Sequence, residues 1–456
     1  MEINGVNIDE VVLQDLCKPR SSSGGRKIQK VPPCLRDENK DHLYVPKIVS
    51  FGPYHHGNPK FQITEEYKYK VMQDLIPRHN DVVNNYNSFL VIIKEIRDWY
   101  VEGSTDRYSD AELARMMLLD ACLLLSFMLD IRSAVGVIDL ATIYAIIDDI
   151  SLLENQIPLW ILKRLATSIF GDGNISSRGK EYSSWKELLG KFCKKMIFSV
   201  FEEAIIEIWS SDDDFLHLCN DDCLHLLQLF REIYVSGYDT GRRNALPPST
   251  CFQKYFRCAR LSKIQRRISR INSFRSVTDL KSKGILCKPS SLLTLNGIKF
   301  KSYYLFAKLE LPPLAIDSDC LVMYANMIAY ETSNIGMSGD CYQITDYINF
   351  VKSLIISAED AKELREQGIH FNGLGTDKEV VKVLQEIPSG PLFSFGSFSD
   401  VGWEIHQHTS SKKRIFLAEL FWTHFSSPWS FMTLFVAIVL LGSTLAQSYF
   451  TIYPRK

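Results

Sequence analysis

Two adjacent histidines, His55 and His56, are the first residues along the chain whose side chains suit acid–base or metal chemistry. Imidazole changes its charge near neutral pH, so the pair could serve as pH-sensitive or catalytic groups. A metal ion needs three or four converging donors, and no Cys, His or carboxylate cluster follows at ligand spacing. The alternative is structural, because Pro53 fixes φ and Tyr54 can anchor the loop by packing its ring.

The segment LLENQIP, 152–158, is the second candidate for chemistry, since it places Glu154 beside two amides between apolar runs. Asn155 and Gln156 could orient Glu154 as a general acid or base. In the alternative, these three side chains bind free backbone groups at a point where Pro158 disfavours helix in the residue before it and a new helix begins. The pattern leaves both interpretations open.

Single polar residues also interrupt apolar helical runs. Asp120 lies in RMMLLDACLLLSFMLD, where it favours a buried helix of a soluble domain over a membrane span. Asn326 and Glu331 lie in NMIAYE, on a helix that otherwise packs through apolar side chains. We interpret all three as structural polar groups and keep them as candidate site residues.

The segment HLCNDDCLH, 217–225, holds four soft metal donors within nine residues. Zinc fingers pair close cysteines and separate them from the histidines, a spacing that this segment lacks. The sequence shows no phosphate loop, nucleophile elbow or dinucleotide fingerprint either. It therefore predicts no metal and no cofactor, while the possibility of an enzyme stays open.

Length and composition predict a folded chain with a large core. The 456 residues are 46% hydrophobic, and the formal net charge of -1 gives no whole-chain attraction for nucleic acid, which we do not expect as a partner. The 11 cysteines are scattered singly in a chain too large to need a disulfide framework. Reduced thiols in a cytosolic setting fit this pattern.

The elements that must position these residues are mainly α-helices. Serine or threonine three residues before glutamate predicts capped helix starts at SDAE, 109–112, SWKE, 184–187, and TDKE, 376–379. Thr64 is a further predicted cap, and the helix from 184 is expected to run to about residue 209. The exception is 292–306, where Asn296 and Gly297 suit a type I′ turn and predict a small β-hairpin.

The C-terminal region is predicted to anchor the protein in a membrane. No Asp, Glu, Lys or Arg occurs from 420 to 454, and FMTLFVAIVLLGSTLAQSYF, 431–450, is close to the roughly 20 apolar residues that a spanning helix needs. A buried core helix is the alternative, but core helices seldom stay free of charge for so long. The fold class is therefore a large helical domain with a small β-hairpin and one C-terminal transmembrane helix.

The start of the chain, MEINGVNIDEVVLQDLC, lacks the basic and apolar regions of a secretory signal. An anchor so near the C-terminus then favours tail insertion, with the bulk of the chain in the cytosol. The expected segments are a flexible tail at 1–27, a helical domain at 28–410, a juxtamembrane segment at 411–428 and the transmembrane helix at 429–453.

A basic insertion spans about 240–278, without an acid between Thr240 and Thr278. Apolar residues at helical spacing among the basic ones would suit an amphipathic helix lying on anionic lipid. A solvated surface face is the alternative. The lipid-facing candidates are Lys263, Arg266, Arg267 and Arg270.

Several segments together resemble one family. VPPCLRDENKDHLYVPKIVSFGPYHHG, RMMLLDACLLLSFML and DISLLENQIPLWIL are similar, in this order, to successive signatures of the plant proteins called domain of unknown function 247, the UPF0481 type. LPPLAIDSDCLVMYANMIAYE and the C-terminal apolar run continue the resemblance. Ala121 departs from the glycine usual in that family, and little likeness is found from 388 to 408.

The resemblance implies a plant-restricted, largely helical membrane protein with no established biochemical activity. Some grass members are associated with pollen self-incompatibility, which suggests recognition rather than turnover. Our first hypothesis is therefore a single-pass membrane protein that binds unknown protein partners and touches lipid through its C-terminal helix. The alternative is an uncharacterised enzyme with a site near Glu154 and the His55/His56 loop.

Overall fold

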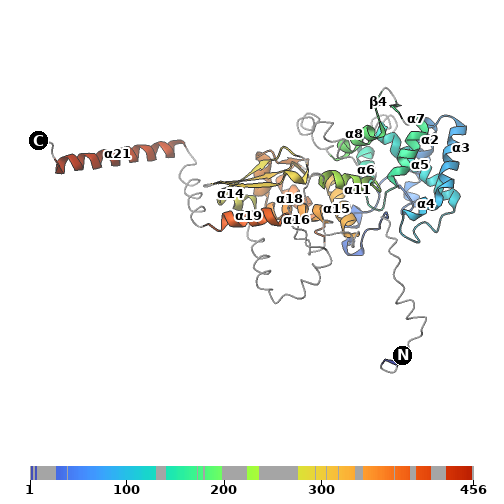
Figure 1. Cartoon of the computed structure of the whole chain (residues 1–456), viewed down its shortest axis with the longest axis horizontal. Helices are drawn as coiled ribbons and strands as arrows, with labels where there is room; N and C mark the ends of the chain where they lie inside the picture. The colour runs from blue at the N-terminus through green and yellow to red at the C-terminus, as the bar shows by residue number, and fades with distance from the viewer. Residues whose placement is uncertain are drawn as a thin grey trace. The chain divides into compact units, whose positions relative to one another are not determined.

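The fold is known from a computed structural model, which is mainly α-helical as predicted (Figure 1). The residues that it describes are 2–3, 6–7, 27–37, 40–129, 140–171, 173–177, 180–197, 223–235, 276–292, 294–303, 306–316, 318–333, 342–373, 375–390, 397–411 and 428–453. The basic candidates Lys263, Arg266, Arg267 and Arg270 lie outside them, as do His217 and Cys219.

The chain divides into two compact units. The first comprises residues 1–30, 45–188 and 221–229, and the second comprises 31–44, 189–220 and 230–456. The elements of the first unit are β1 (Glu2–Ile3), β2 (Val6–Asn7), η3 (Pro59–Phe61), α2 (Gln62–Leu75), α3 (His79–Val91), α4 (Ile93–Asp98), α5 (Asp110–Leu129), α6 (Leu140–Ile150), α7 (Leu159–Phe170), β3 (Ile175–Ser177) and β4 (Lys180–Tyr182). Helices α8 (Trp185–Ile197) and α11 (Leu226–Val235) each contain a boundary between the two units.

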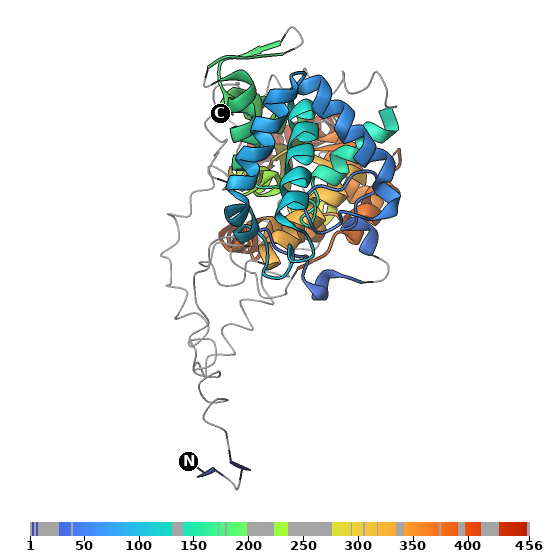
Figure 2. The ribbon, with the colours of Figure 1, turned by 90° about the vertical axis from the view of Figure 1, so that its right-hand side faces the viewer.

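Helix α5 is the centre of the first unit. It contacts α2, α3, α4 and α7 (Figure 2). Fifteen of its 20 residues are buried, including Asp120. A helix that is apolar on all sides is stable in water only when others cover it, so the predicted buried helix is confirmed. It begins as predicted, because Glu112 accepts from the Ser109 N–H and Ser109 Oγ accepts from the Glu112 N–H.

Two predicted helix starts differ in the structure. Helix α2 already begins at Gln62, and Thr64 does not cap it, since its hydroxyl donates to the Ile48 carbonyl. The Thr64 side chain therefore makes a tertiary hydrogen bond in place of the predicted helix cap. At α8, Ser184 caps as expected, but the Glu187 carboxylate accepts from Ser183. The described part of α8 ends at Ile197, and the rest of the predicted helix lies outside the described residues.

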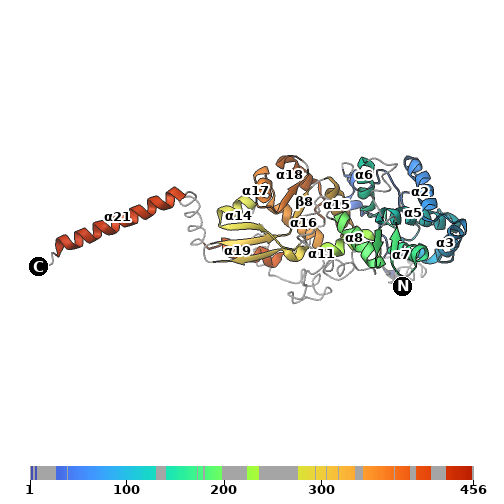
Figure 3. The same cartoon turned by 90° about the horizontal axis from the view of Figure 1, so that it is seen from above.

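In its described residues, the second unit combines helices with two small sheets (Figure 3). Its three-stranded sheet has the order β5-β7-β6, with β7 parallel to β5 and antiparallel to β6, and β8 pairs with β9 in parallel. Its elements are η1 (Pro33–Leu35), η2 (Asp41–Leu43), α14 (Val277–Ser282), β5 (Ile285–Pro289), η6 (Leu295–Gly297), β6 (Lys299–Ser302), β7 (Ala307–Leu311), β8 (Leu314–Ile316), α15 (Ser318–Ser333), α16 (Gln343–Leu354), α17 (Ala358–Glu366), β9 (His370–Asn372), α18 (Asp377–Glu386), α19 (Ser399–Thr409) and α21 (Pro428–Ile452).

A small β-hairpin is present, but it is shifted along the chain from the one predicted at 292–306, and its turn is not at Asn296–Gly297. Those residues belong to the 3₁₀ turn η6, while β6 and β7 pair in antiparallel, with Ser302 opposite Ala307. Gly297 is required for space, because a Cβ there would lie 2.6 Å from Ser290 Oγ and 2.8 Å from the Leu292 carbonyl oxygen. Close packing explains the glycine that the sequence pattern assigned to a positive φ angle.

Helix α21 is the predicted C-terminal apolar helix. It spans 25 residues, and its window Met432–Tyr449 is the one helix among the described residues that is long and apolar enough to cross a membrane. None of that window is buried in the structure. The structure therefore does not show this segment as a buried core helix, which was the alternative.

Candidate functional site

The loop at residues 47–57 carries the sequence-predicted residues Pro53, Tyr54, His55 and His56. It is largely buried at 49–53, where the backbone forms no helix or strand and its N–H groups need other partners. Asp149, at the end of α6, accepts the backbone N–H groups of Lys47, Ile48 and Val49 at 2.7, 2.7 and 2.8 Å. Burial raises the pKa of Asp149 to about 6, against these three donors, which lower it.

Asn155 continues this support of the loop. Its Oδ1 accepts the Phe51 N–H at 2.7 Å, and its Nδ2 donates to the carbonyl oxygens of Val49 and Asp149 at 3.0 and 2.9 Å. All three amide contacts therefore go to backbone groups. Asn155 thus ties the loop to the turn after α6 by the backbone binding that one of the two sequence interpretations describes.

Gln156 and Gly52 lock the same turn. Gln156 Nε2 donates to the carbonyl oxygens of Ile150 and Leu152, both at 2.7 Å, while its Oε1 accepts the Leu227 N–H at 3.2 Å. The Gln156 carbonyl oxygen would lie 2.7 Å from a Cβ at position 52, where φ is +70°. Only glycine allows both this approach and this backbone conformation without strain.

Beneath the loop lies a buried ion pair. Asp120 on α5 accepts hydrogen bonds from the Gly52 N–H at 2.7 Å and from the Lys68 ammonium at 2.6 Å. Lys68 on α2 also donates to the Ser50 carbonyl oxygen at 2.6 Å and to the Glu65 carboxylate at 2.5 Å. Burial would lower the pKa of Lys68, but the carboxylates of Asp120 and Glu65 outweigh it and raise that pKa. The ammonium therefore stays charged and holds α2, α5 and the loop together.

The two histidines lie above this pair, each near a carboxylate. His55 Nε2 is 3.6 Å from Glu154 Oε2, and His56 Nδ1 is 3.7 Å from Glu65 Oε2. His56 also packs edge-on against the ring of Tyr108, at 5.7 Å between centroids. Burial lowers the pKa of His56 despite the opposing effect of Glu65, so its neutral form is favoured.

The structure thus brings eight of the sequence-predicted residues into one region of the first unit, namely Pro53, Tyr54, His55, His56, Asp120, Glu154, Asn155 and Gln156. Pro158 lies at the N-cap of α7, where the new helix begins. Most of the polar atoms here bind backbone. The pair His55 and Glu154 is the part of the region whose chemistry suits proton transfer.

Asn326 and Glu331 belong to the second unit and not to this region. Asn326 Nδ2 donates to the carbonyl oxygens of Leu43 and Val322, at 2.8 and 2.9 Å. Glu331 accepts Arg231 Nε at 2.8 Å and the backbone N–H groups of Ile344 and Thr345 at 3.0 and 2.9 Å. They connect α15 with η2, α11 and the start of α16, a structural role.

Three residues of these networks were missed from the sequence. Lys68 looks like a surface partner of Glu65 three positions earlier, whereas its side chain is fully buried. Asp149 and Arg231 do carry a signal, since each is an ionised residue beside an apolar run, in YAIIDDI and LLQLFREIY. Asp120 carries the same signal, an ionised residue within an apolar run, and that signal predicts a cationic partner. It does not indicate that the partner is Lys68.

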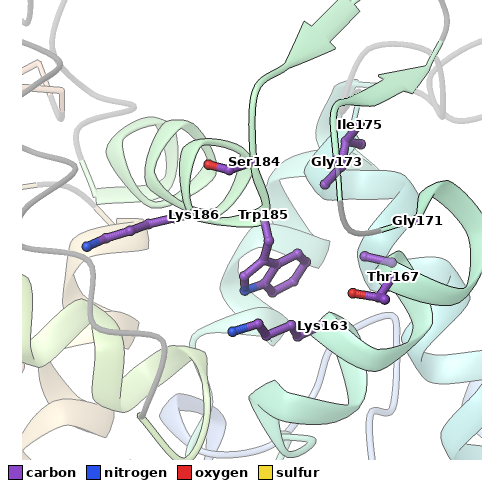
Figure 4. Close-up of a pocket in the computed structure, with 9 residues that line it drawn as sticks. Lys163, Thr167, Gly171, Gly173, Ile175, Ser184, Trp185 and Lys186 are labelled. Atoms are coloured by element: carbon purple, nitrogen blue, oxygen red, sulfur yellow. The ribbon is translucent and has the colours of Figure 1, made fainter.

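A pocket of about 240 Å³ lies elsewhere in the first unit, between α7, β3 and the start of α8. Figure 4 shows the indole of Trp185 pointing into it, with Lys163 and Thr167 of α7 nearby. No sequence-predicted site residue lines this pocket. The lining residues are Lys163, Ala166, Thr167, Gly171, Gly173, Ile175, Ser184, Trp185 and Lys186.

Metal binding has no support in the part of the chain that the structure describes. Within it, no group of three or more His, Cys, Asp or Glu side chains is placed to hold a metal ion. His225, from the soft-donor segment, is fully buried, and its Nδ1 accepts the Gln228 N–H at 3.2 Å, as an N-cap of α11 does. Burial lowers its pKa to about 3.

Comparison with known proteins gives relatives without an assigned activity. The chain is 24% identical over 436 residues to UPF0481 protein At3g47200 of Arabidopsis thaliana, which covers 89% of this chain and 82% of the relative. It is 21% identical over 487 residues to the putative UPF0481 protein At3g02645 of the same plant, with 91% and 88% covered. No solved structure matches. A family model described as plant protein of unknown function, DUF247, matches residues 28–443, and the chain therefore belongs to that family.

Proposed function

We propose that this protein is a single-pass membrane protein whose helical body, held mainly on the cytosolic side, works by binding other proteins. The observation that carries the proposal is helix α21. Its 18-residue window Met432–Tyr449 contains no charged side chain and is entirely exposed in the structure. Apolar side chains exposed on every side of a helix are stable in hydrocarbon and not in water.

Protein binding is favoured over catalysis by how the body uses its ionisable groups. Asp149 is bound to three backbone N–H groups, and Glu331 to two backbone N–H groups and Arg231. Such carboxylates hold loops in place and have few lone pairs left for a substrate. The resemblance to relatives associated with recognition points the same way.

Membrane insertion is tested by charging the helix. Replacing Ile438 and Leu441 with arginine costs about 3 kcal/mol per residue at the centre of a span. The double variant should therefore leave carbonate-resistant membranes and appear in the soluble fraction. The matched control is Ile63→Arg, because Ile63 is an exposed apolar residue of α2 in the body. A double variant that stays in the membrane like the control contradicts the anchor.

Protein binding by the body is tested by exchanging the anchor. Residues 429–453 are replaced with an unrelated tail-anchor helix, and proximity labelling is compared between the native and exchanged chains in the same membrane. Partners of the body should be labelled in both. A partner set that changes completely with the helix would assign binding to α21 and refute the proposed role of the body.

A second candidate function is an enzyme that uses His55 and Glu154. The observation that favours it is their approach to 3.6 Å, with side chains 16% and 9% exposed. A carboxylate that orients an imidazole is a common arrangement of a general base. If a turnover assay finds a substrate, Glu154→Gln should lower kcat by about 10²-fold or more. Equal kcat for the variant and the native chain would remove this candidate.

A further inference from the structure

Two aromatic rings lie exposed at the turn of the β6–β7 hairpin. The side chains of Tyr303 and Phe306 are 47% and 49% exposed, and their rings stack at 4.8 Å between centroids with an angle of 28° between their planes. The Tyr303 N–H donates to the Phe306 carbonyl at 2.8 Å, which closes the turn. Tyr304 and Leu305 stand between them in the sequence. Two exposed aromatic rings that stack on each other indicate a contact surface.

The base of this hairpin is fixed to α19. The Ser302 hydroxyl and His408 Nδ1 are hydrogen-bonded at 2.9 Å, and the rings of Phe300 and His408 pack edge-on at 6.1 Å. His408 is in the last turn of α19, next to its final residue, Thr409. Helix α19 also contacts β6 (Figure 3), so the hairpin is held against α19.

The end of α19 is joined to α21 by a short tether. Helix α19 ends at Thr409 and α21 begins at Pro428, so residues 410–427 are all that separates them. A chain of this length reaches at most about 60 Å when fully extended. If α21 spans a bilayer, the hairpin turn is confined to a shell next to the surface from which α21 enters.

The chemistry of the hairpin matches that surface. Tyrosine and other amphipathic rings prefer the headgroup region, where one end can stay hydrated. Lys299, Lys301 and Lys308 flank the rings, against one acid, Glu310, which pairs with Lys301 and Lys308 at 3.2 and 2.9 Å. The net positive charge is attracted to anionic headgroups.

We propose that Tyr303 and Phe306, at the end of the β6–β7 hairpin, form a second membrane contact and insert their rings into the headgroup region of an anionic leaflet. This inference rests on the proposed function, because the tether brings the hairpin to a bilayer only if α21 spans one. It adds a docked orientation of the second unit at the surface. The hairpin, α19 and α21 then form a two-point attachment.

The test uses the full-length chain with a photoreactive residue. p-Benzoylphenylalanine replaces Phe306 in one variant, Phe435 of α21 in a second and Tyr144 of α6 in a third, and each is reconstituted in vesicles of phosphatidylcholine and phosphatidylserine. Tyr144 is the matched control, since it is an aromatic residue 48% exposed. Lipid adducts are counted by mass spectrometry after illumination.

The expected result is a high yield of lipid adducts at positions 435 and 306 and a low yield at 144. Adducts at 435 with no more at 306 than at 144 would overturn the membrane contact of the hairpin and leave the anchor standing. No lipid adduct at 435 would overturn the anchor and this inference with it. Protein–protein adducts in place of lipid adducts at 306 would also overturn the inference.

A charge variant tests whether the hairpin binds anionic lipid or only lies close to the bilayer. Lys299→Glu, combined with the photoreactive residue at 306, should lower the lipid yield by about fivefold or more in the vesicles with phosphatidylserine. One lysine near an anionic surface contributes about 1 kcal/mol, and the new carboxylate is repelled in addition. Lys362→Glu, an exposed lysine of α17, is the matched control and should leave the yield unchanged. Equal loss in both variants, or in neither, would contradict docking by the hairpin.

Discussion

Lys68 and Asp120 form an ion pair inside the first unit, with 2.6 Å between Nζ and Oδ1 and with side chains 0% and 1% exposed. They are 52 positions apart in the sequence. The same two side chains bind the backbone of the loop at Ser50 and Gly52. The segment that carries both histidines is therefore positioned by a buried charge pair on two helices.

Removal of one member of this pair should destabilise the first unit strongly. Asp120→Ala leaves the ammonium of Lys68 buried with only Glu65 as a charged partner, at a cost of about 3–5 kcal/mol in the free energy of unfolding. Urea denaturation followed by circular dichroism measures the change. Lys68→Met combined with Asp120→Leu should recover much of the loss, because no unpaired buried charge remains. A single variant as stable as the native chain would show that the pair does not hold the loop.

Gly52→Ala should destabilise the protein more than Gly57→Ala does. Both glycines have positive φ angles, +70° and +85°, but a Cβ at 52 would meet the Gln156 carbonyl oxygen at 2.7 Å, while one at 57 has nothing within 4 Å. We expect a loss of about 1–2 kcal/mol at 57 from backbone strain, and about 2–4 kcal/mol at 52, where steric overlap adds to it. Denaturant unfolding of the two variants gives the comparison. Equal losses would indicate that the close approach to Gln156 relaxes freely.

Acid should destabilise the first unit through His225. Burial lowers the pKa of this imidazole to about 3 in the folded chain, below the ordinary value of 6.5, so the unfolded chain binds a proton at pH values where the folded chain does not. The contribution of His225 to stability is then full above pH 6.5 and is lost as the pH falls towards 3. Between neutral pH and pH 5 the loss is about 2 kcal/mol.

The variant His225→Asn checks this titration, because asparagine can still cap α11 but does not ionise in this range. Its unfolding free energy should change less between pH 7 and pH 5 than that of the native chain. His79→Asn is the control, since His79 is an exposed residue at the start of α3. The same pH dependence in the native chain and in His225→Asn would contradict the assignment.

Asn174 tests the topology without any mutation. It begins the one Asn-x-Ser/Thr sequon of the sequence, NIS, and the residue is exposed at the surface of the first unit. With the body on the cytosolic side, Asn174 should carry no glycan when the chain is made in a plant cell. A sequon added in an extension after Lys456 is the control and should be glycosylated, because tail insertion carries it across the membrane. A glycan on Asn174 would reverse the proposed orientation.

Local signals predicted the helix starts at Ser109 and Thr376, where both capping partners lie within one turn. Ser109 with Glu112 and Thr376 with Glu379 form the predicted capping boxes, each by bonds between residues three apart. The apolar helix around Asp120 and the C-terminal helix were likewise predictable, because composition alone requires that such helices be covered by protein or by lipid. Membership of a plant family of unknown function also followed from motifs in their order along the chain.

Tertiary structure decided what distant partners do. Thr64 binds Ile48 instead of capping α2, Gly297 is needed for space instead of a turn, and Lys68 is buried against Asp120. In each case the local sequence pattern is compatible with both the predicted and the observed arrangement. A contact with a segment distant in the sequence stabilises the observed one. Whether His55 and Glu154 meet was open in the sequence for the same reason. Their approach depends on the fold of about a hundred intervening residues, and hydrophobic periodicity specifies which faces are buried, not which faces meet.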